Sequence, residues 1–429
     1  MKVIFFQIVI IWGYSANVVG QIILSGNQLL VNGKPYDIRG VCWSPCGIGD
    51  SIGSKFTDWY KMDLPMIAAM HANTVRTYYP IEDINVLDAI NVNGLKVIIG
   101  FTTADTVKDL AYIDQFKNHK AILMWCFGNE FNYHPEWFGG DVRNWYNRLE
   151  ALAKRARELD PNHPVTTAHG ELPNSLARTM CPSVKLWGIN AYRWDSLVNL
   201  FEDWAQRSSL PIWISESGAD SYHTEYRDPP SGYESETEQD SASQKIWQRV
   251  MDNLGSRDPQ KQCIGITFFE FNDEWWKAGN PSSQDIGEFS PPGVAYDNFF
   301  NEEYWGFVKI DRTPKQVYNR FKKIWQQFST NVRNPKDVKQ PFSPVLFQNQ
   351  PNPFNENTQI SFVLNEPGYT VLKVYSIVGE EVTTLSQGYL RAGHYKVRFN
   401  AKGLSTGIYF YRLKSSNSLG FGKMLYIIK

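Results

Sequence analysis

The sequence predicts an α/β protein, a (β/α)8 barrel followed by a small C-terminal β-sandwich. Two observations predict the barrel: eight short apolar segments recur over about 300 residues, and segments of helical periodicity separate them. A third observation predicts the sandwich. Beyond a polar, proline-containing stretch, short alternating strands punctuated by glycines fill the C-terminal part of the chain.

The first 20 residues predict a signal peptide (residues 1–20). Lys2 precedes an apolar run from Val3 to Trp12, and small residues follow up to Gly20. This run is too short and wrongly flanked for a membrane-spanning helix, and the alternative is a buried N-terminal strand. Since no later stretch is long and apolar enough to cross a membrane, we expect an exported, soluble protein without a transmembrane segment.

Residues 21–330 are predicted to form the barrel, preceded by a short N-terminal β-hairpin at the turn signals Ser25-Gly26-Asn27 and Asn32-Gly33-Lys34. The clearest helix is Asp141–Leu159, where Asp141 is an N-cap and Pro161 ends the helix. The eight predicted strands are Asp37–Trp43, Asn73–Thr77, Leu95–Phe101, Ala121–Phe127, Pro164–Ala168, Leu186–Asn190, Pro211–Ser215 and Cys263–Phe269. The other predicted helices are Asp105–Phe116, Ser196–Ala205, Thr237–Leu254 and Lys315–Phe328.

The C-terminal part is predicted to be a linker and a separate β-domain. Residues 331–350 are polar and carry Pro335, Pro341 and Pro344, which is typical of a linker. Residues 351–429 are expected to form the β-sandwich. Its predicted strands are Gln359–Leu364, Thr370–Tyr375, Tyr395–Phe399, Ile408–Leu413 and Lys423–Ile428.

Two predicted strands end in carboxylic acids. The apolar run Ala121–Phe127 leads through Gly128 to Asn129 and Glu130, and the seventh strand ends in Glu216. A carboxyl group at the end of a buried strand is costly unless it is hydrogen-bonded or used, and barrel active sites lie at these strand ends. The two glutamates are 86 residues apart. Three units of about 29 residues fit a barrel that needs about 31 per unit.

Two long loops are expected to wall a cleft over these strand ends. One follows Glu216 as far as about Glu236, and the other runs from Glu270 to about Arg312. Their aromatic side chains and a histidine are Tyr222, His223, Tyr226 and Tyr233 in the first loop, and Trp275, Trp276, Phe289, Tyr296, Phe299, Phe300, Tyr304 and Trp305 in the second.

Composition excludes some partners. A net charge of −1 provides no basic field for nucleic acid or anionic lipid. The 5 cysteines show no metal-ligand spacing; Cys126 and Cys263 fit buried thiols, and we do not favour a Cys42–Cys46 bridge. We therefore expect no metal or organic cofactor and no nucleic-acid partner. The 15 tryptophans suggest flat surfaces for sugar rings or other planar ligands.

Several of these segments resemble one enzyme clan. Trp125-Cys-Phe-Gly-Asn129-Glu130 resembles the Asn-Glu signature of retaining (β/α)8-barrel glycoside hydrolases, the clan that includes families 2, 5, 17 and 72. Ile214-Ser-Glu216-Ser-Gly218 resembles the nucleophile strand of that clan, and Asn73-Thr-Val-Arg76-Thr77 its second strand. Val31 to Gly40 looks like the lead-in to the barrel of family 2. The resemblance covers about Gln21 to Gln327.

The resemblance implies roles for individual residues. Glu130 would be the general acid/base and Glu216 the nucleophile. Asn129 would bind the sugar 2-hydroxyl, and Arg76 would hydrogen-bond Glu216 and keep it ionised. Arg76 is alternatively a structural ion-pair partner within the barrel, and Glu130 taken alone is alternatively a helix cap.

Further substrate-binding residues are expected around this pair. Asn190 and Tyr192 are similar to a polar-residue-then-tyrosine pair of the clan, and Trp43 ends the first strand. His169 is a substrate contact or a hydrogen-bonded interior histidine.

The end of the eighth strand departs from the clan. Many members place a tryptophan there against the sugar, whereas this chain reads Phe268-Phe269-Glu270-Phe271. The aromatic platform is then Phe269, Phe271, Trp275 or Trp276, although the two tryptophans are alternatively packing residues of the loop. Glu270 and Glu274 are rival carboxylates to Glu216, or serve substrate binding.

The tail resembles the C-terminal sorting domain of the type IX secretion system. The matching segments are Phe347 to Asn355, Val374 to Gly379, Gly403 to Arg412 and Lys423-Met424. This implies export through the periplasm to the cell surface or medium, with the secretion machinery as a partner. The tail would act as a secretion signal and would carry no catalytic residues.

The predicted function is a retaining β-glycosidase that hydrolyses a β-linked glucan or gluco-oligosaccharide by double displacement. Retention requires carboxyl groups about 5 to 5.5 Å apart, one protonated and one charged. A glucanosyltransferase, in which a second sugar replaces water, uses the same glutamate pair. A rival of another class is a non-catalytic carbohydrate-binding surface protein on an inactive barrel.

Overall fold

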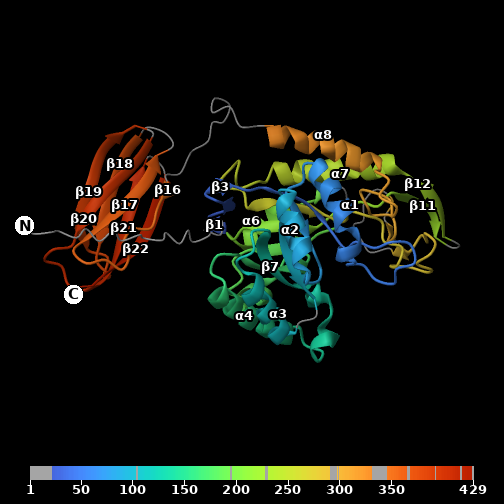
Figure 1. Ribbon diagram of the computed structural model, residues 1–429, viewed down its shortest axis with the longest axis horizontal. Coiled ribbons are helices and arrows are strands. Elements are labelled where there is room, and N and C mark those ends of the chain that lie inside the picture. The colour runs from blue at the N-terminus through green and yellow to red at the C-terminus, as the bar shows by residue number, and fades with distance from the viewer. Residues whose placement is uncertain are drawn as a thin grey trace, which may run out of the picture. The chain divides into compact units, whose positions relative to one another are not determined.

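The computed structural model describes residues 22–102, 105–193, 196–227, 230–289, 297, 299–330, 345–364, 368–391, 393–415 and 418–427. The chain divides into two compact units, Met1–Val332 and Arg333–Lys429 (Figure 1). The predicted signal peptide and most of the predicted linker lie outside the described residues.

The first unit is a closed barrel of eight parallel strands. The last of these strands pairs with the first, Gly265 to Phe268 lying opposite Ile38 to Val41, which closes the sheet. All eight predicted strands are confirmed, and so is the predicted barrel fold. In chain order the strands are β4 (Ile38–Cys42), β5 (Thr74–Arg76), β6 (Lys96–Phe101), β7 (Ile122–Asn129), β8 (Val165–Gly170), β9 (Trp187–Asn190), β10 (Ile212–Glu216) and β13 (Cys263–Phe268).

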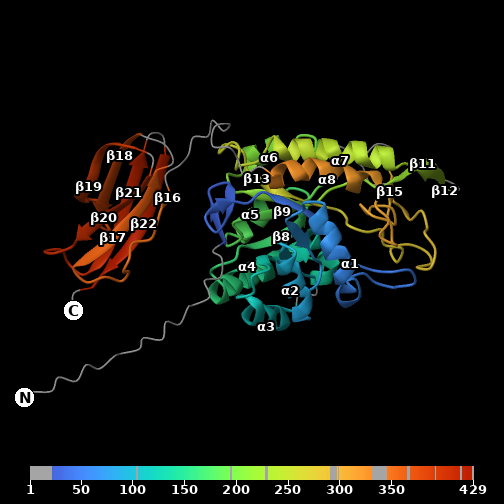
Figure 2. The same cartoon turned by 45° about the horizontal axis from the view of Figure 1, so that its top comes forward.

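Helices surround the barrel strands (Figures 1 and 2). α7 and α8 lie side by side in both views, and the indoles of Trp247 and Trp325 pack 5.7 Å apart between them. The helices are α1 (Phe56–Ala69), α2 (Ile84–Val92), α3 (Thr106–Phe116), α4 (Val142–Leu159), α5 (Ser175–Met180), α6 (Leu200–Arg207), α7 (Glu236–Met251) and α8 (Gln316–Thr330). Within the described part of the chain, no helix combines the length and apolar character that crossing a membrane requires.

Helix ends follow their capping residues. The Asp141 carboxylate accepts a hydrogen bond from the Arg143 amide, so α4 begins where predicted. α6 begins later than predicted because Leu197 and Asn199 adopt left-handed backbone angles (φ 49° and 56°) that a helix cannot continue. The sequence analysis omitted α1, α2 and α5; α1 contains Pro65 and α5 is only one short segment of 6 residues.

A small sheet covers one end of the barrel. It consists of β1 (Ile22–Ser25), β2 (Gln28–Val31) and β3 (Lys34–Pro35), one strand more than the predicted hairpin. Ile22 and Leu29 are buried in one cluster with Ile38 and Ile264, which lie at the N-terminal ends of their barrel strands. The opposite end of the barrel, at the C-terminal ends of the strands, is therefore where a ligand-binding site is expected.

The two long loops form small structures of their own. The loop after β10 folds into a hairpin of β11 (Tyr222–Arg227) and β12 (Pro230–Glu234). The loop after β13 contains the short pair β14 (Glu288–Phe289) and β15 (Phe300–Asn301). All five cysteines are buried free thiols, so Cys42 and Cys46 are not bridged.

The second unit is the predicted β-sandwich. One sheet has the order β16-β17-β20 and the other β19-β18-β21-β22, and side chains from both sheets share one core around Phe362, Val374 and Tyr411. β16 and β19 were not predicted, because β16 has 2 residues and β19 is largely polar. The strands are β16 (Val345–Leu346), β17 (Asn357–Leu364), β18 (Gly368–Tyr375), β19 (Glu381–Leu390), β20 (Gly393–Asn400), β21 (Gly407–Ser415) and β22 (Ser418–Tyr426).

Candidate active site

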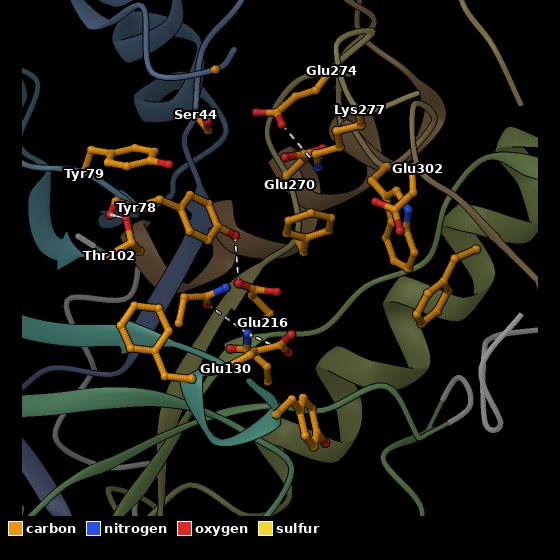
Figure 3. Close-up of a pocket in the computed structure, with 18 of the residues that line it drawn as sticks. Ser44, Tyr78, Tyr79, Thr102, Glu130, Glu216, Glu270, Glu274, Lys277 and Glu302 are labelled. Atoms are coloured by element: carbon orange, nitrogen blue, oxygen red, sulfur yellow. Dashed lines mark hydrogen bonds and ion pairs between the residues drawn. The ribbon is translucent and has the colours of Figure 1, made fainter. Parts of the chain in front are cut away.

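A cavity of about 920 Å³ opens at the C-terminal ends of the barrel strands. Asn129 ends β7 and Glu130 directly follows it, Asn190 ends β9 and Glu216 ends β10, and all four side chains line it. Figure 3 shows Glu130 and Glu216 projecting into the same space. Two carboxyl groups from strands far apart in the chain therefore meet in one cavity.

Glu216 is held by three hydrogen-bond donors. Arg76 Nη1 lies 2.6 Å from Oε1 and Tyr78 donates its hydroxyl to the same oxygen at 2.8 Å. Tyr192 donates its hydroxyl to Oε2 at 3.1 Å. A guanidinium and two hydroxyls on one buried carboxylate stabilise its negative charge and fix its orientation.

Arg76 also positions Asn129. Its Nη2 donates to Asn129 Oδ1 at 2.7 Å, and Asn190 Nδ2 donates to the same oxygen at 3.1 Å. Because both contacts engage Oδ1, the amide of Asn129 offers its Nδ2 group to the cavity. The Asn190 amide is oriented in turn by Ser215, whose hydroxyl donates to Asn190 Oδ1 at 2.7 Å.

Glu130 occupies a different environment. Its backbone is left-handed (φ 55°), directly after Asn129, and Asn190 Nδ2 donates to its Oε1 at 3.1 Å. Burial, with a further contribution from the negative charge of Glu216, raises the pKa of Glu130 to about 7. The two carboxyl groups of the cavity therefore have different surroundings: burial favours the protonated form of Glu130, whereas three donors contact Glu216.

Most of the other predicted site residues lie at the cavity. Tyr192, Glu270 and Trp276 line it, and so does Phe269. Arg76 lies beneath the cavity floor, 1% exposed, and acts on it through Glu216 and Asn129.

Three predicted substrate-binding residues, Trp43, His169 and Trp275, are not among the described residues that line the cavity. Trp43 is fully buried, with its indole N–H donating to Asp63 at 2.9 Å, so its polar atom serves the core. His169 is buried between the Tyr146 hydroxyl (3.2 Å) and the Glu171 carbonyl oxygen (2.8 Å), and burial lowers its pKa. Trp275 lies in the loop after β13 but not among the lining residues. The platform candidate Phe271 is fully buried as well.

Lining residues that the sequence analysis missed come mostly from loops. Tyr78 carries a signal that was available, since it lies two residues beyond Arg76 and so on the same face of an extended chain. Lys277 and Glu302 lie in the long loop after β13, where no sequence pattern predicts which side chains reach the cavity. At the mouth, His134 stacks on Trp137 with ring centroids 3.9 Å apart, and both line the cavity.

Only one of the two long loops contributes to the described lining. The loop after β13 supplies Phe300, Glu302 and Trp305 in addition to the residues above. In the hairpin after β10, His223 stacks on Tyr233 at 5.1 Å, and neither ring lies among the lining residues. The described residues of that loop therefore do not contribute to the lining of this cavity. Tyr296 and the side chains of Tyr226 and Phe289 lie outside what the structure describes.

Comparison with known proteins matches both units. Residues 102–274 match the TIM barrel domain of glycosyl hydrolases family 2, and residues 350–427 match a secretion system C-terminal sorting domain. The human β-glucuronidase is 25% identical over 327 residues, which cover 68% of this chain and 47% of that protein. The β-glucuronidase of Paenibacillus borealis is 23% identical over 282 residues, 54% of this chain and 43% of that protein. The chain thus spans about half the length of the curated relatives it matches.

Solved structures share the fold. The β-D-glucuronidase of Dictyoglomus thermophilum superposes with a TM-score of 0.53 at 19% identity, covering 72% of this chain and 54% of that one. A family 2 β-galacturonidase from Eisenbergiella tayi gives a TM-score of 0.53 at 20% identity, with the same coverage of 72% and 54%.

The barrel, with its paired glutamates, defines the class as (β/α)8-barrel glycoside hydrolases. Within that class the chain carries the family 2 TIM barrel domain together with a type IX sorting domain. The sorting domain makes it a secreted or cell-surface protein.

Proposed function

We propose that this protein is a retaining β-glycosidase, with Glu216 as nucleophile and Glu130 as general acid/base. The observation that carries the proposal is the pair of carboxyl groups in one cavity with opposite surroundings. Three donors hold Glu216, whereas burial raises the pKa of Glu130 to about 7. Retaining hydrolysis requires this combination, one charged carboxylate and one carboxylic acid beside the same anomeric centre.

In the first step, a Glu216 oxygen attacks the anomeric carbon while Glu130 gives its proton to the departing glycosidic oxygen. The glycosidic bond breaks, and a glycosyl ester of Glu216 forms. In the second step, Glu130, now ionised, takes a proton from water, whose oxygen displaces Glu216 and restores the starting state. Asn129 offers its Nδ2 group to the 2-hydroxyl of the sugar, a contact that strengthens in the transition state.

Arg76, Tyr78 and Tyr192 serve the nucleophile throughout this cycle. They donate to the Glu216 carboxylate before attack and after release of the sugar, which stabilises its negative charge and fixes its orientation. Asn190 bridges the two halves of the site, because one amide group contacts both Asn129 and Glu130.

The names of the matched relatives indicate the linkage of the substrate. The matched relatives are named β-glucuronidases and one neighbour a β-galacturonidase, so a β-linked glycoside is the common feature. We further propose a β-linked glucan or gluco-oligosaccharide, for which the large cavity and the aromatic rings of Trp276 and Trp137 provide room and stacking surfaces.

The test is hydrolysis of defined β-linked oligosaccharides and aryl β-glycosides by the full chain. We expect retention of the β-configuration in the first product, and a fall in kcat/KM by a factor of about 10⁴ or more in Glu216→Ala. Added azide should restore turnover of that variant with an α-glycosyl azide as product, because the small anion replaces the carboxylate. Unchanged processing in Glu216→Ala would contradict the proposal and favour a role for the barrel in binding alone. Chain elongation at high substrate concentration would identify transfer in place of hydrolysis.

A further inference from the structure

A second group of charged side chains lines the cavity apart from the glutamate pair. We define the glutamate–lysine cluster as Glu270, Glu274 and Lys277, all from the loop after β13 (Figure 3). Lys277 Nζ lies 2.8 Å from Glu270 Oε1 and 3.2 Å from Glu274 Oε2. One ammonium group thus serves two carboxyl groups, and the mechanism above uses none of the three.

The cluster lies beside the position of the reacting sugar. Lys277 Nζ stands 4.1 Å from the centre of the Phe269 ring, and Phe269 meets the ring of Tyr192 edge to face at 6.4 Å. Tyr192 in turn donates to Glu216. Glu216 and the cluster line the same cavity, so a sugar whose anomeric carbon faces Glu216 shares that cavity with the cluster.

Two oxygens of the cluster are buried without a partner. Glu270 Oε2 and Glu274 Oε1 meet no donor in good hydrogen-bond geometry within the part of the chain that the structure describes, although both side chains are only 2% exposed; the Ser44 hydroxyl is the polar neighbour of Glu274 from outside the cluster. Leaving buried carboxyl oxygens unsatisfied is costly, and native proteins rarely do so outside functional sites. Both residues line the cavity, so a ligand is in reach to supply the missing donors.

The charged groups on this side of the cavity favour neutral ligands over anionic ones. Glu302 adds a third carboxyl group, and Lys277 is the only lysine or arginine among the described residues that line the cavity. The nearby Arg76 and Arg193 are engaged by Glu216 and Glu171. Burial raises the pKa of Glu270, Glu274 and Glu302, so this side of the cavity disfavours further negative charge. A substrate carboxylate adds such a charge, which only Lys277 offsets, whereas hydroxyl groups add none and can donate to the free oxygens.

Aromatic donors complete the wall. The indole nitrogens of Trp276 and Trp305 are buried with no partner among the described residues, and both side chains line the cavity. A sugar hydroxyl can donate to a carboxyl oxygen and accept from an indole N–H at once. A carboxylate can only accept. It could accept from the indoles, but it would then lie close to three carboxyl groups, which is unfavourable.

We propose that the glutamate–lysine cluster binds hydroxyl groups of a neutral hexopyranosyl unit in the site and excludes uronic acids. This inference rests on the proposed glycosidase function and gives it a substrate class that differs from the one in the names of the matched relatives. Glu270 and Glu274 accept from the hydroxyl groups, and Lys277 holds the two carboxyl groups in place.

The test compares matched pairs of p-nitrophenyl β-glycosides on the full chain: glucoside against glucuronide, and galactoside against galacturonide. We expect kcat/KM to be at least about 10-fold higher for the neutral member of the better pair, the effect of one unpaired buried charged group. In Glu270→Gln, kcat/KM for the neutral glycoside should fall by about 10- to 100-fold and the neutral-to-uronide ratio should shrink, because one oxygen acceptor of the carboxyl group is replaced by an amide nitrogen. The control is Glu202→Gln, the same change on the exposed side of α6, which should leave both rates as they are.

Several results would overturn the inference. A uronide cleaved faster than its neutral partner contradicts the exclusion. A β-glucosaminide cleaved faster than the glucoside contradicts it too, since the carboxyl groups would then serve an ammonium group of the substrate. An equal loss on both members of a pair in Glu270→Gln reduces the cluster to a structural role. Failure to cleave any β-glycoside overturns the proposed function itself and, with it, this inference.

Discussion

At the scale of single residues, Glu130 and Glu216 illustrate how one side-chain type acquires two chemical states. Glu216 receives a guanidinium and two tyrosine hydroxyls, all aimed at its two oxygens. Glu130 receives one amide and is otherwise enclosed. Because the low-dielectric surroundings disfavour a charge without donors, the proton belongs on Glu130.

The pKa of Glu130 predicts the alkaline limb of the pH profile. Only the protonated acid can donate to the leaving oxygen, so kcat/KM should fall as the pH rises through about 7. In Glu130→Gln this limb should disappear, and the loss should be smaller for a p-nitrophenyl leaving group, which needs little protonation. The measurement is kcat/KM from pH 4 to 9 on two substrates of different leaving-group pKa. A wild-type limb that persists in Glu130→Gln would assign the titration to another group.

Substitution of Arg76 should lower kcat by an effect that is separate from the titration of Glu130. Arg76→Lys keeps a positive charge but cannot contact Glu216, Asn129 and the Ser215 carbonyl oxygen together, since only a guanidinium has that fork geometry. We expect kcat to fall about 100-fold or more with a smaller change in KM, because the nucleophile is misplaced and loses charge stabilisation. Matched thermal midpoints of the variant and the wild type would show that the loss is not unfolding. Wild-type kcat in Arg76→Lys would reduce Arg76 to a structural ion pair.

The two cavity glutamates could be predicted from the sequence because Glu130 directly follows, and Glu216 ends, a short and mostly apolar strand, a pattern with few structural explanations. The remaining lining residues could not. Trp43 directly follows β4, yet its indole donates to Asp63, a residue of α1 that no local pattern connects with it. Lys277 and Glu302 depend on how a long loop folds, and a loop without periodicity carries no positional signal.

At the scale of elements, the turn after β7 determines where the acid lies. Gly128 has φ 74°, and a Cβ atom there would lie 2.6 Å from the Trp145 ring of α4. Two residues later Glu130 is itself left-handed at φ 55°. Such backbone costs of order 1–3 kcal/mol for a residue with a side chain, so the surrounding packing must hold it.

Gly128→Ala should therefore damage both stability and activity. The added methyl group clashes with Trp145 and disfavours the left-handed backbone, so we expect a loss of about 2–4 kcal/mol in the free energy of unfolding. In the folded fraction, kcat should fall because Asn129 and Glu130 shift from their positions. Gly139→Ala is the control: its φ is 73° as well, but its nearest neighbour is 3.8 Å away at the end of the Asn144 side chain. It should cost stability without affecting kcat.

A buried ion pair ties α1 to the segment after β15. Arg312 contacts both oxygens of Asp63, at 2.9 and 3.1 Å, and the same carboxylate accepts from Trp43. Asp63→Asn leaves the Arg312 charge buried without its counter-charge, so the free energy of unfolding should fall by about 3–5 kcal/mol. Denaturant unfolding measures this, and double substitution with Arg312→Met should restore part of the loss. An unchanged midpoint in Asp63→Asn would mean that solvent or another carboxyl group compensates.

At the scale of the whole molecule, the two units have separate hydrophobic cores. The barrel core draws on the strands and the helices around them, and the sandwich core on Phe362, Val374 and Tyr411 with their neighbours. The sequence predicted this division because period-2 alternation replaces helical periodicity after the proline-containing stretch. It did not predict β19, whose polar residues are largely exposed and carry no apolar pattern.

The division also predicts that the activity resides in the first unit. Every described residue that lines the cavity lies before Val332, and so does each residue that positions the glutamate pair. A chain ending at Val332 should keep kcat/KM within about 2-fold of the full chain, because no described catalytic contact is removed. It should also keep the neutral-to-uronide ratio, while export to the cell surface or medium should fail in a host with the secretion machinery. The measurements are kinetics of the purified proteins and immunodetection in cell fractions. A folded but inactive truncated chain would show that the sandwich contributes to the site. Normal export of the truncated chain would show that the export signal lies elsewhere in the chain.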